Sequence, residues 1–154
     1  MTEVSSQASE CVIALAQLLT GKIQGIDQKW LHAFLRIDAE EGAMGARCSY
    51  VNANGVHLVG PIENQDLYHR AIEIGEQLRA ATHRHERAFK VCLLIVDASF
   101  NYELKFEYED ASKWMITKLD GATGIPVGIT AADLAALDKP SPPTTPRRPW
   151  YRFW

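Results

Sequence analysis

The alternation of residues between Phe100 and Tyr108 constrains the fold more than any other feature of this sequence. Every second position carries an aromatic or aliphatic side chain, and the positions between them are polar or charged. Successive side chains of a β-strand point to opposite faces of its sheet. The pattern therefore predicts an antiparallel strand with a charged face and a buried face, the latter formed by Phe100, Tyr102, Leu104, Phe106 and Tyr108.

The segment Ala88–Val96, directly before this strand, is an almost unbroken apolar run. Such a run with several β-branched residues is typical of a strand that is buried on both faces. Only the short turn at Asp97-Ala-Ser separates the two segments, which predicts a β-hairpin. Period-two alternation and turn residues elsewhere predict three earlier strands, at Lys29–Ala39, Ala46–Val51 and Val56–Val59.

Two longer helices are predicted from apolar residues that recur every three or four positions. The first runs from Val4 to Thr20, with Gly21 as its C-cap. The second covers Asn64–His83, with Asn64 as its N-cap.

The C-terminal third is less regular. Lys113–Leu119 fits either a sixth strand or one helical turn. Thr130–Leu137 fits a short helix that Thr130 caps, with Asp133 at the capping-box position. The whole pattern predicts an α+β fold of order α-β-β-β-α-β-β-α, in which helices pack on one side of an antiparallel sheet as a two-layer sandwich. We expect one domain over residues 1–138 and a Pro-rich, basic and aromatic C-terminal tail over residues 139–154.

Charge is distributed unevenly between these two parts. Residues 1–138 carry all 19 acidic residues and 12 of the 16 basic ones, a net charge of −7, whereas the tail carries four basic residues and no acid. An acidic body argues against direct binding of nucleic acid and suits a basic protein partner. An alternative explanation is that the negative charge of residues 1–138 only keeps the protein soluble. The tail either folds back over the body or contacts a partner.

Cellular location is inferred from three features. The cysteines Cys11, Cys48 and Cys92 are odd in number and widely spaced, so we expect free buried thiols rather than disulfides. No apolar run approaches the ~18 residues of a membrane helix. The first residues are polar and acidic, unlike the basic start of a signal peptide. The sequence thus predicts a cytoplasmic protein that does not bind membranes.

Signatures of catalysis are weak. The glycine-rich phosphate-binding motifs Gly-x-x-x-x-Gly-Lys-Ser/Thr and Gly-x-Gly-x-x-Gly do not occur in the sequence. The histidine pair His83-Arg-His85 lacks a convergent set of further metal ligands. Glu107 and Glu109 stand ~7 Å apart along a strand, so an acid–base pair is one alternative. Lys105 alternates with them, which favours an ordinary charged outer face. We therefore predict no cofactor, no metal and no enzymatic activity.

Several segments together resemble the YezG-like family of bacterial immunity proteins, which are antitoxins of polymorphic toxin systems. The resemblance covers about residues 28–110. It rests on Trp30-Leu-His-Ala-Phe-Leu-Arg-Ile-Asp-Ala, Cys48-Ser-Tyr50, the turn at Gly55, the helix with Leu67 and Leu78, Cys92-Leu-Leu-Ile-Val-Asp97 and Phe100-Asn-Tyr-Glu-Leu-Lys-Phe-Glu-Tyr-Glu-Asp110. The resemblance implies a cytoplasmic protein that binds a cognate toxin domain, often a nuclease, and blocks its active site or substrate groove.

For such a partner, the candidate binding surface is the charged face of the last hairpin together with the acidic loop before residue 42. Its residues are Asp38, Glu40, Glu41, Glu103, Glu107, Glu109 and Asp110. We expect a monomer or weak dimer. A second interpretation is a type III-like secretion chaperone that binds an effector segment, because the order of helices and strands is also typical of that class.

Overall fold

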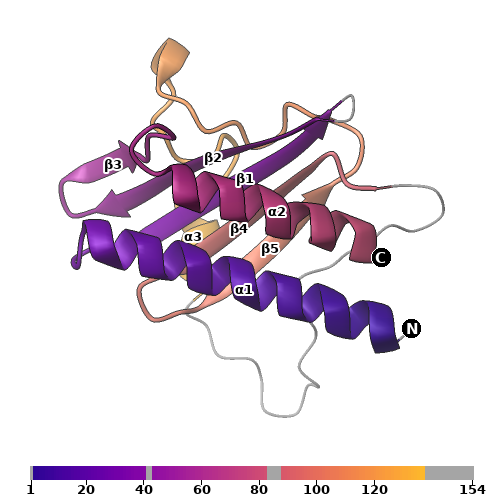
Figure 1. Cartoon of the computed structure of the whole chain (residues 1–154). Helices are drawn as coiled ribbons and strands as arrows, with labels where there is room; N and C mark the ends of the chain where they lie inside the picture. The colour runs from indigo at the N-terminus through magenta and orange to yellow at the C-terminus, as the bar shows by residue number, and fades with distance from the viewer. Residues whose placement is uncertain (1, 41–42, 83–87, 138–154) are drawn as a thin grey trace.

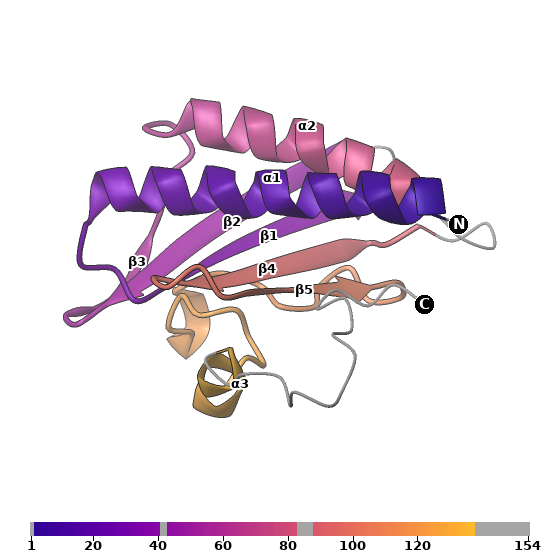
Figure 2. The same cartoon turned by 90° about the horizontal axis from the view of Figure 1, so that it is seen from below.

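The computed structural model describes residues 2–40, 43–82 and 88–137. They form a five-stranded antiparallel sheet with two long helices across one face (Figures 1 and 2). The elements in chain order are α1 (Thr2–Ile26), β1 (His32–Glu40), β2 (Ala43–Asn52), β3 (Gly55–Leu58), α2 (Gln65–Ala81), β4 (Val91–Asp97), β5 (Tyr102–Glu107), the 3-10 turn η1 (Leu119–Gly121) and α3 (Ala131–Ala136). The expected α+β class and element order are confirmed.

The strands follow the order β3-β2-β1-β4-β5, so β1 lies in the centre of the sheet. Strand β1 pairs with β2 from His32↔Val51 to Glu40↔Ala43, and with β4 from His32↔Asp97 to Asp38↔Val91. Every residue of β4 is buried, as its apolar sequence predicts. Strand β5 pairs with β4 only, among the strands described.

The main core lies between the sheet and the two long helices. From the sheet it takes alternate residues, such as Ala33, Leu35 and Ile37 of β1. From α1 it takes residues spaced three or four apart, namely Ala8, Cys11, Val12, Leu15, Leu19 and Ile23. The apolar periods of the sequence therefore predict correctly which residues of the sheet and of α1 face the core.

Helix α1 does not end at Gly21, as the sequence predicts, but continues through Gly21 and Gly25 to Ile26. Each interior glycine costs about 1 kcal/mol relative to alanine. Complete burial of Ile23 contributes about 2 kcal/mol, and the Trp30 indole N–H donates to Gln24 Oε1 at 2.9 Å. Tertiary contacts in the last two turns thus offset the glycines. Trp30 accordingly joins the helix-side core and not the opposite face, where its alternation with Phe34 places it.

Two residues at the starts of predicted elements, Asn64 and Phe100, also differ from expectation. Asn64 precedes α2 but makes no side-chain cap; its Nδ2 donates instead to the Gly60 carbonyl at 2.9 Å. Phe100 lies outside β5 with a φ of 65° and is 38% exposed, so it is not a core residue of that strand. The Asp97 carboxylate accepts the N–H groups of Ser99 and Asn101, and this tight turn forces Phe100 into the left-handed region.

Residues 110–137, here called the strap, cross the sheet face opposite α1 and α2 (Figure 2). Sheet and strap share a second, smaller core of Phe34, Leu93, Ile95 and Ile116. The strap covers the apolar side chains on this face, because β4 is apolar on both faces and Phe34 of β1 lies beside it. The partly buried hydrophobic residues packed against this core are Val51, Trp114, Ile125, Ile129, Leu134 and Leu137.

Within the strap, the segment Lys113–Leu119 forms neither the strand nor the helical turn that the sequence allows. Trp114 interrupts both, because its φ is 59°. The capping box of α3 is confirmed: Thr130 Oγ1 accepts the Asp133 N–H, and the Asp133 carboxylate accepts the Thr130 N–H. This short helix packs on the opposite face from the two long ones. The expected tail, residues 139–154, lies outside the described residues.

Candidate functional site

Four of the candidate acids share the sheet face opposite α1 and α2. Ala33, Leu35 and Ile37 point toward the helices, so the intervening residues of β1, including Asp38 and Glu40, point the other way. Leu104 of β5 likewise joins the helix-side core. The residues on either side of it therefore point to the opposite face, and these include two candidate acids, Glu103 and Glu107.

Sheet register separates these acids into two groups. Asp38 pairs with Val91, which pairs with Glu107, so two strand spacings of ~4.8 Å separate the two acidic residues. Glu109 follows β5, and Asp110 begins the strap. Glu41 lies outside the described residues. The site thus has a β1 group and a β5 group on the same face, with the buried strand β4 between them.

The acids of β5 are engaged in contacts that shape the hairpin end. The Glu103 carboxylate lies 3.5 Å from Lys105 Nζ, and that of Glu107 lies 3.9 Å from Lys113 Nζ. Glu107 Oε2 also accepts the N–H groups of Glu109 and Asp110, at 3.1 and 3.0 Å. Glu107 is therefore an anchor of the turn into the strap, a role that alternation alone does not reveal.

Arg36 is the central residue of the site, and sequence reasoning assigned it no role. Arg36 is only 3% exposed, although its side chain is a cation. Its Nε donates to the Lys113 carbonyl at 2.8 Å and its Nη2 to the Ala111 carbonyl at 2.6 Å. Its Nη1 donates to Asp38 Oδ2 at 3.2 Å. Arg36 therefore fastens the start of the strap to the centre of the sheet.

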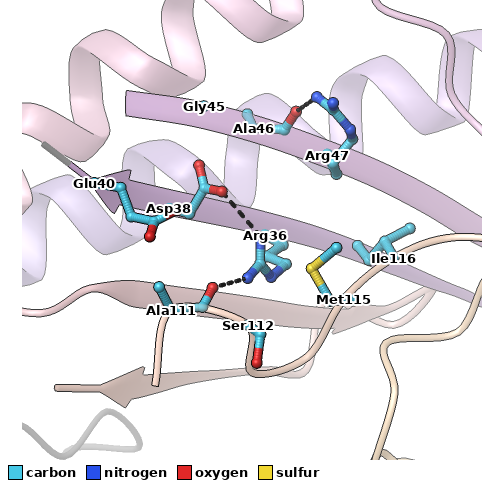
Figure 3. A pocket seen from close by; sticks show the side chains of 10 residues that line it. All are labelled: Arg36, Asp38, Glu40, Gly45, Ala46, Arg47, Ala111, Ser112, Met115 and Ile116. Carbon is cyan, nitrogen blue, oxygen red and sulfur yellow. Dashed lines mark hydrogen bonds and ion pairs between the residues drawn. The ribbon is translucent and has the colours of Figure 1, made fainter. Parts of the chain in front are cut away.

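A cavity of about 390 Å³ opens beside Arg36, between the ends of β1 and β2 and the strap (Figure 3). This volume lies in the range of small-molecule and side-chain pockets. Two arginines, two acids, a serine and several small or apolar residues line it. They are Arg36, Asp38, Glu40, Gly45, Ala46, Arg47, Ala111, Ser112, Met115 and Ile116.

The space beside Asp38 depends on the glycine opposite it. Gly45 pairs with Asp38 across the strands, and a Cβ at Gly45 would lie 2.8 Å from Asp38 Oδ1. In Figure 3 the Asp38 carboxylate is directed toward β2, along which Gly45 lies. Arg47, the cross-strand partner of Arg36, turns its Nη1 back to the Ala46 carbonyl at 2.9 Å. The Asp38 side chain thus stays 33% exposed at the cavity, whereas the guanidinium of Arg36 is enclosed by protein groups.

Further contacts fix the rest of the strap above the sheet. Ser49 Oγ donates to the Gly124 carbonyl at 2.7 Å in a buried position. Lys118 Nζ donates to the Val56 carbonyl at 2.6 Å. At the rim of the site, Asp110 Oδ1 accepts from the Ser112 hydroxyl and N–H, and these bonds lower the pKa of the Asp110 carboxyl. Asp110 is therefore ionised at neutral pH.

The cysteines contribute no reactive thiolate to this face. Cys11, Cys48 and Cys92 are free and buried in the helix-side core. Burial raises the pKa of all three thiols, and that of Cys92 to about 12. A protonated thiol is a poor nucleophile and a poor metal ligand.

Among residues 2–40, 43–82 and 88–137, no group of three or more histidine, cysteine or carboxylate side chains converges as metal ligands would. None of the helices in the described ranges is both long and apolar enough to cross a lipid bilayer. The pair His83-Arg-His85 lies outside those ranges.

Comparison with known proteins yields no assignment. The sequence matches no protein-family model and no curated protein.

Proposed function

We propose that this chain is an immunity protein, which binds a cognate bacterial toxin and blocks its active site or substrate groove. The observation that carries the proposal is the acidic end of the sheet face opposite α1 and α2. There, Asp38 and Glu40 line a cavity whose wall is the strap, which begins at Asp110. The resemblance of residues 28–110 to the YezG-like family supports the same function.

Charge favours a nuclease as the toxin. A nuclease must grip phosphate groups and therefore exposes a basic surface. An acidic partner is attracted to that surface, which accelerates association and competes with the nucleic acid. The net charge of −7 over residues 1–138 fits this role. In this proposal the protein acts in the cytoplasm, as a monomer or weak dimer, and without catalysis.

The primary test is co-expression with the toxin encoded by the neighbouring gene. We expect the chain to protect the cells and to form a stoichiometric complex with the folded toxin domain. Cells that still die, with no complex recovered, would refute the proposal.

Charge reversal tests the binding face. We expect Glu40→Lys and Asp110→Lys each to slow association with the toxin about tenfold at low salt and to weaken its salt dependence. Glu76→Lys is the matched control, because Glu76 is exposed on α2, on the other side of the sheet. Stopped-flow kinetics at several salt concentrations measure the effect. Equal rates for all three variants would place the interface elsewhere.

A type III-like secretion chaperone is the alternative, and the observed order α-β-β-β-α-β-β-α favours it. A chaperone holds an extended segment of its effector, whereas an immunity protein holds a folded toxin domain. Limited proteolysis of the complex separates these outcomes. A short protected peptide and a dimer in light scattering would favour the chaperone.

A further inference from the structure

We propose that the cavity beside Asp38 receives a basic side chain, arginine in preference to lysine, from the protein partner. This inference rests on the proposed function and deepens it, because it names the group by which the partner is recognised. Three independent features support it: the state of the buried cation Arg36, the state of the two anions, and the shape and lining of the cavity.

The buried cation of the cavity, Arg36, is already held by protein groups. It donates three bonds, two of them to carbonyl oxygens of the strap. An anionic ligand would have to displace those carbonyls, and the strap would then lose its attachment to the sheet. Access to the Arg36 charge is thus blocked unless the strap moves. Arg47 is exposed, and its Nη1 donates to the Ala46 carbonyl of its own strand (Figure 3).

The anions, in contrast, have capacity to accept more bonds. Among the described residues, Asp38 accepts one bond from Arg36, through Oδ2, and Oδ1 faces the space above Gly45. The Glu40 carboxylate makes no ion pair within the described ranges. The two residues stand two apart on β1, so their Cα atoms are ~7 Å apart and their side chains lie on one face. A guanidinium between them can donate to both.

The shape and lining suit a long side chain with a charged end. Met115 and Ile116 supply an apolar wall for the methylene groups, and Ser112 adds a polar group at the edge. The volume of about 390 Å³ exceeds what one arginine side chain requires and leaves room for its main chain. Arginine is preferred to lysine because its planar fork of five N–H donors bridges two acceptors that a single ammonium cannot.

The probe is N-acetyl-arginine-amide, added to the full-length protein and followed by methyl NMR of methionines. Met115 lines the cavity, whereas Met44 packs against the helix-side core and serves as an internal reference. We expect a saturable shift of the Met115 methyl with half-saturation at about millimolar concentration. Met44 should not respond. N-acetyl-citrulline-amide, which lacks the charge, should give no saturable shift, and the lysine analogue a weaker one.

Two variants and two controls assign the site. Glu40→Gln removes a charge without changing size, and Gly45→Ala places a Cβ against Asp38 Oδ1. Each should raise the half-saturation concentration at least about tenfold. Glu76→Gln and Gly25→Ala should leave it unchanged, because Glu76 lies on α2 and a Cβ at Gly25 meets nothing within 4 Å.

Several results would overturn the inference. These are an unchanged Met115 signal, equal responses to arginine and citrulline, an unaltered response in Glu40→Gln, and preferential binding of N-acetyl-glutamate-amide. The proposed function would survive any of these if the chain still neutralised its toxin. Conversely, a specific arginine response in a chain that protects from no toxin would keep the site and refute the immunity role.

Discussion

At the residue scale, one buried charge, that of Arg36, connects the strap to the sheet. Arg36 lies on the face of β1 opposite Ala33, Leu35 and Ile37, and the strap encloses it. Burial of an arginine is tolerated only where its donors are satisfied and an acid is near. The two strap carbonyls and Asp38 meet that requirement. Removing the guanidinium would leave these buried acceptors without a hydrogen-bond donor. Arg36 should therefore be critical for stability, although it lies outside the main core.

We expect Arg36→Gln to lower the free energy of unfolding by about 3 kcal/mol, because it leaves buried carbonyls and Asp38 without their donor. Arg47→Gln is the control at the cross-strand position and should change it by no more than about 0.5 kcal/mol, since Arg47 is exposed. Urea denaturation followed by circular dichroism measures both. Similar losses for the two variants would contradict the assigned role of Arg36.

At the element scale, glycines in the two long helices have opposite surroundings. Gly21 lies in α1, and a Cβ there would meet nothing within 4 Å. Gly75 lies in α2 against β1, and a Cβ there would lie 3.1 Å from Ile37 Cδ1 and 3.2 Å from Ile37 Cγ2. The first glycine is thus only a weak point of the helix, whereas the second allows α2 to approach the sheet closely.

Because of these surroundings, substitutions of Gly21 and Gly75 should change the free energy of unfolding in opposite directions. Gly21→Ala should raise the free energy of unfolding by about 0.5–1 kcal/mol through helix propensity. Gly75→Val should lower it by about 1–3 kcal/mol, because the added carbons overlap Ile37 in a packed core. Thermal and urea melts of the two variants provide the test. A stabilising Gly75→Val would mean that α2 shifts freely over the sheet.

At the scale of the whole molecule, buried thiols link stability to alkaline pH. The folded pKa of Cys92 is about 12, against an ordinary value of 9.0, because burial disfavours the thiolate. A raised folded pKa contributes stability that is fully present below the unfolded pKa and is lost as the pH rises toward the folded one. The relevant window therefore extends from about pH 9 to about pH 12.

In that window each such thiol should reduce the free energy of unfolding by up to about 1.4 kcal/mol per pH unit. Cys92→Ala should show a shallower decline than the native chain, whatever its absolute stability. Cys11→Ala provides a comparison at a less enclosed thiol, 6% exposed. Urea melts between pH 8 and pH 11 give the slopes. Parallel slopes in native protein and Cys92→Ala would show that the thiol ionises without unfolding.

The sequence by itself determined the class of fold and the orientation of most strand residues. Apolar periods of two and of three to four set which side chains face the core, because burial of that surface dominates folding. The same periodicity predicts Glu103 and Glu107 on an outer face, whereas Asp38 and Glu40, expected in an acidic loop, lie within β1. Local signals also sufficed for the Thr130–Asp133 capping box, since all its groups lie within one turn.

Only the tertiary structure decided what lies above that outer face. The strap has no sustained period, and its position depends on contacts between residues some 75 positions apart, such as Arg36 with Ala111 and Ser49 with Gly124. Such long-range pairings leave no local pattern, because either partner alone looks like an ordinary polar residue. They turn an apparently open acidic face into a cavity with a buried arginine, and they separate the anchoring acid Glu107 from the accessible acids Asp38 and Glu40.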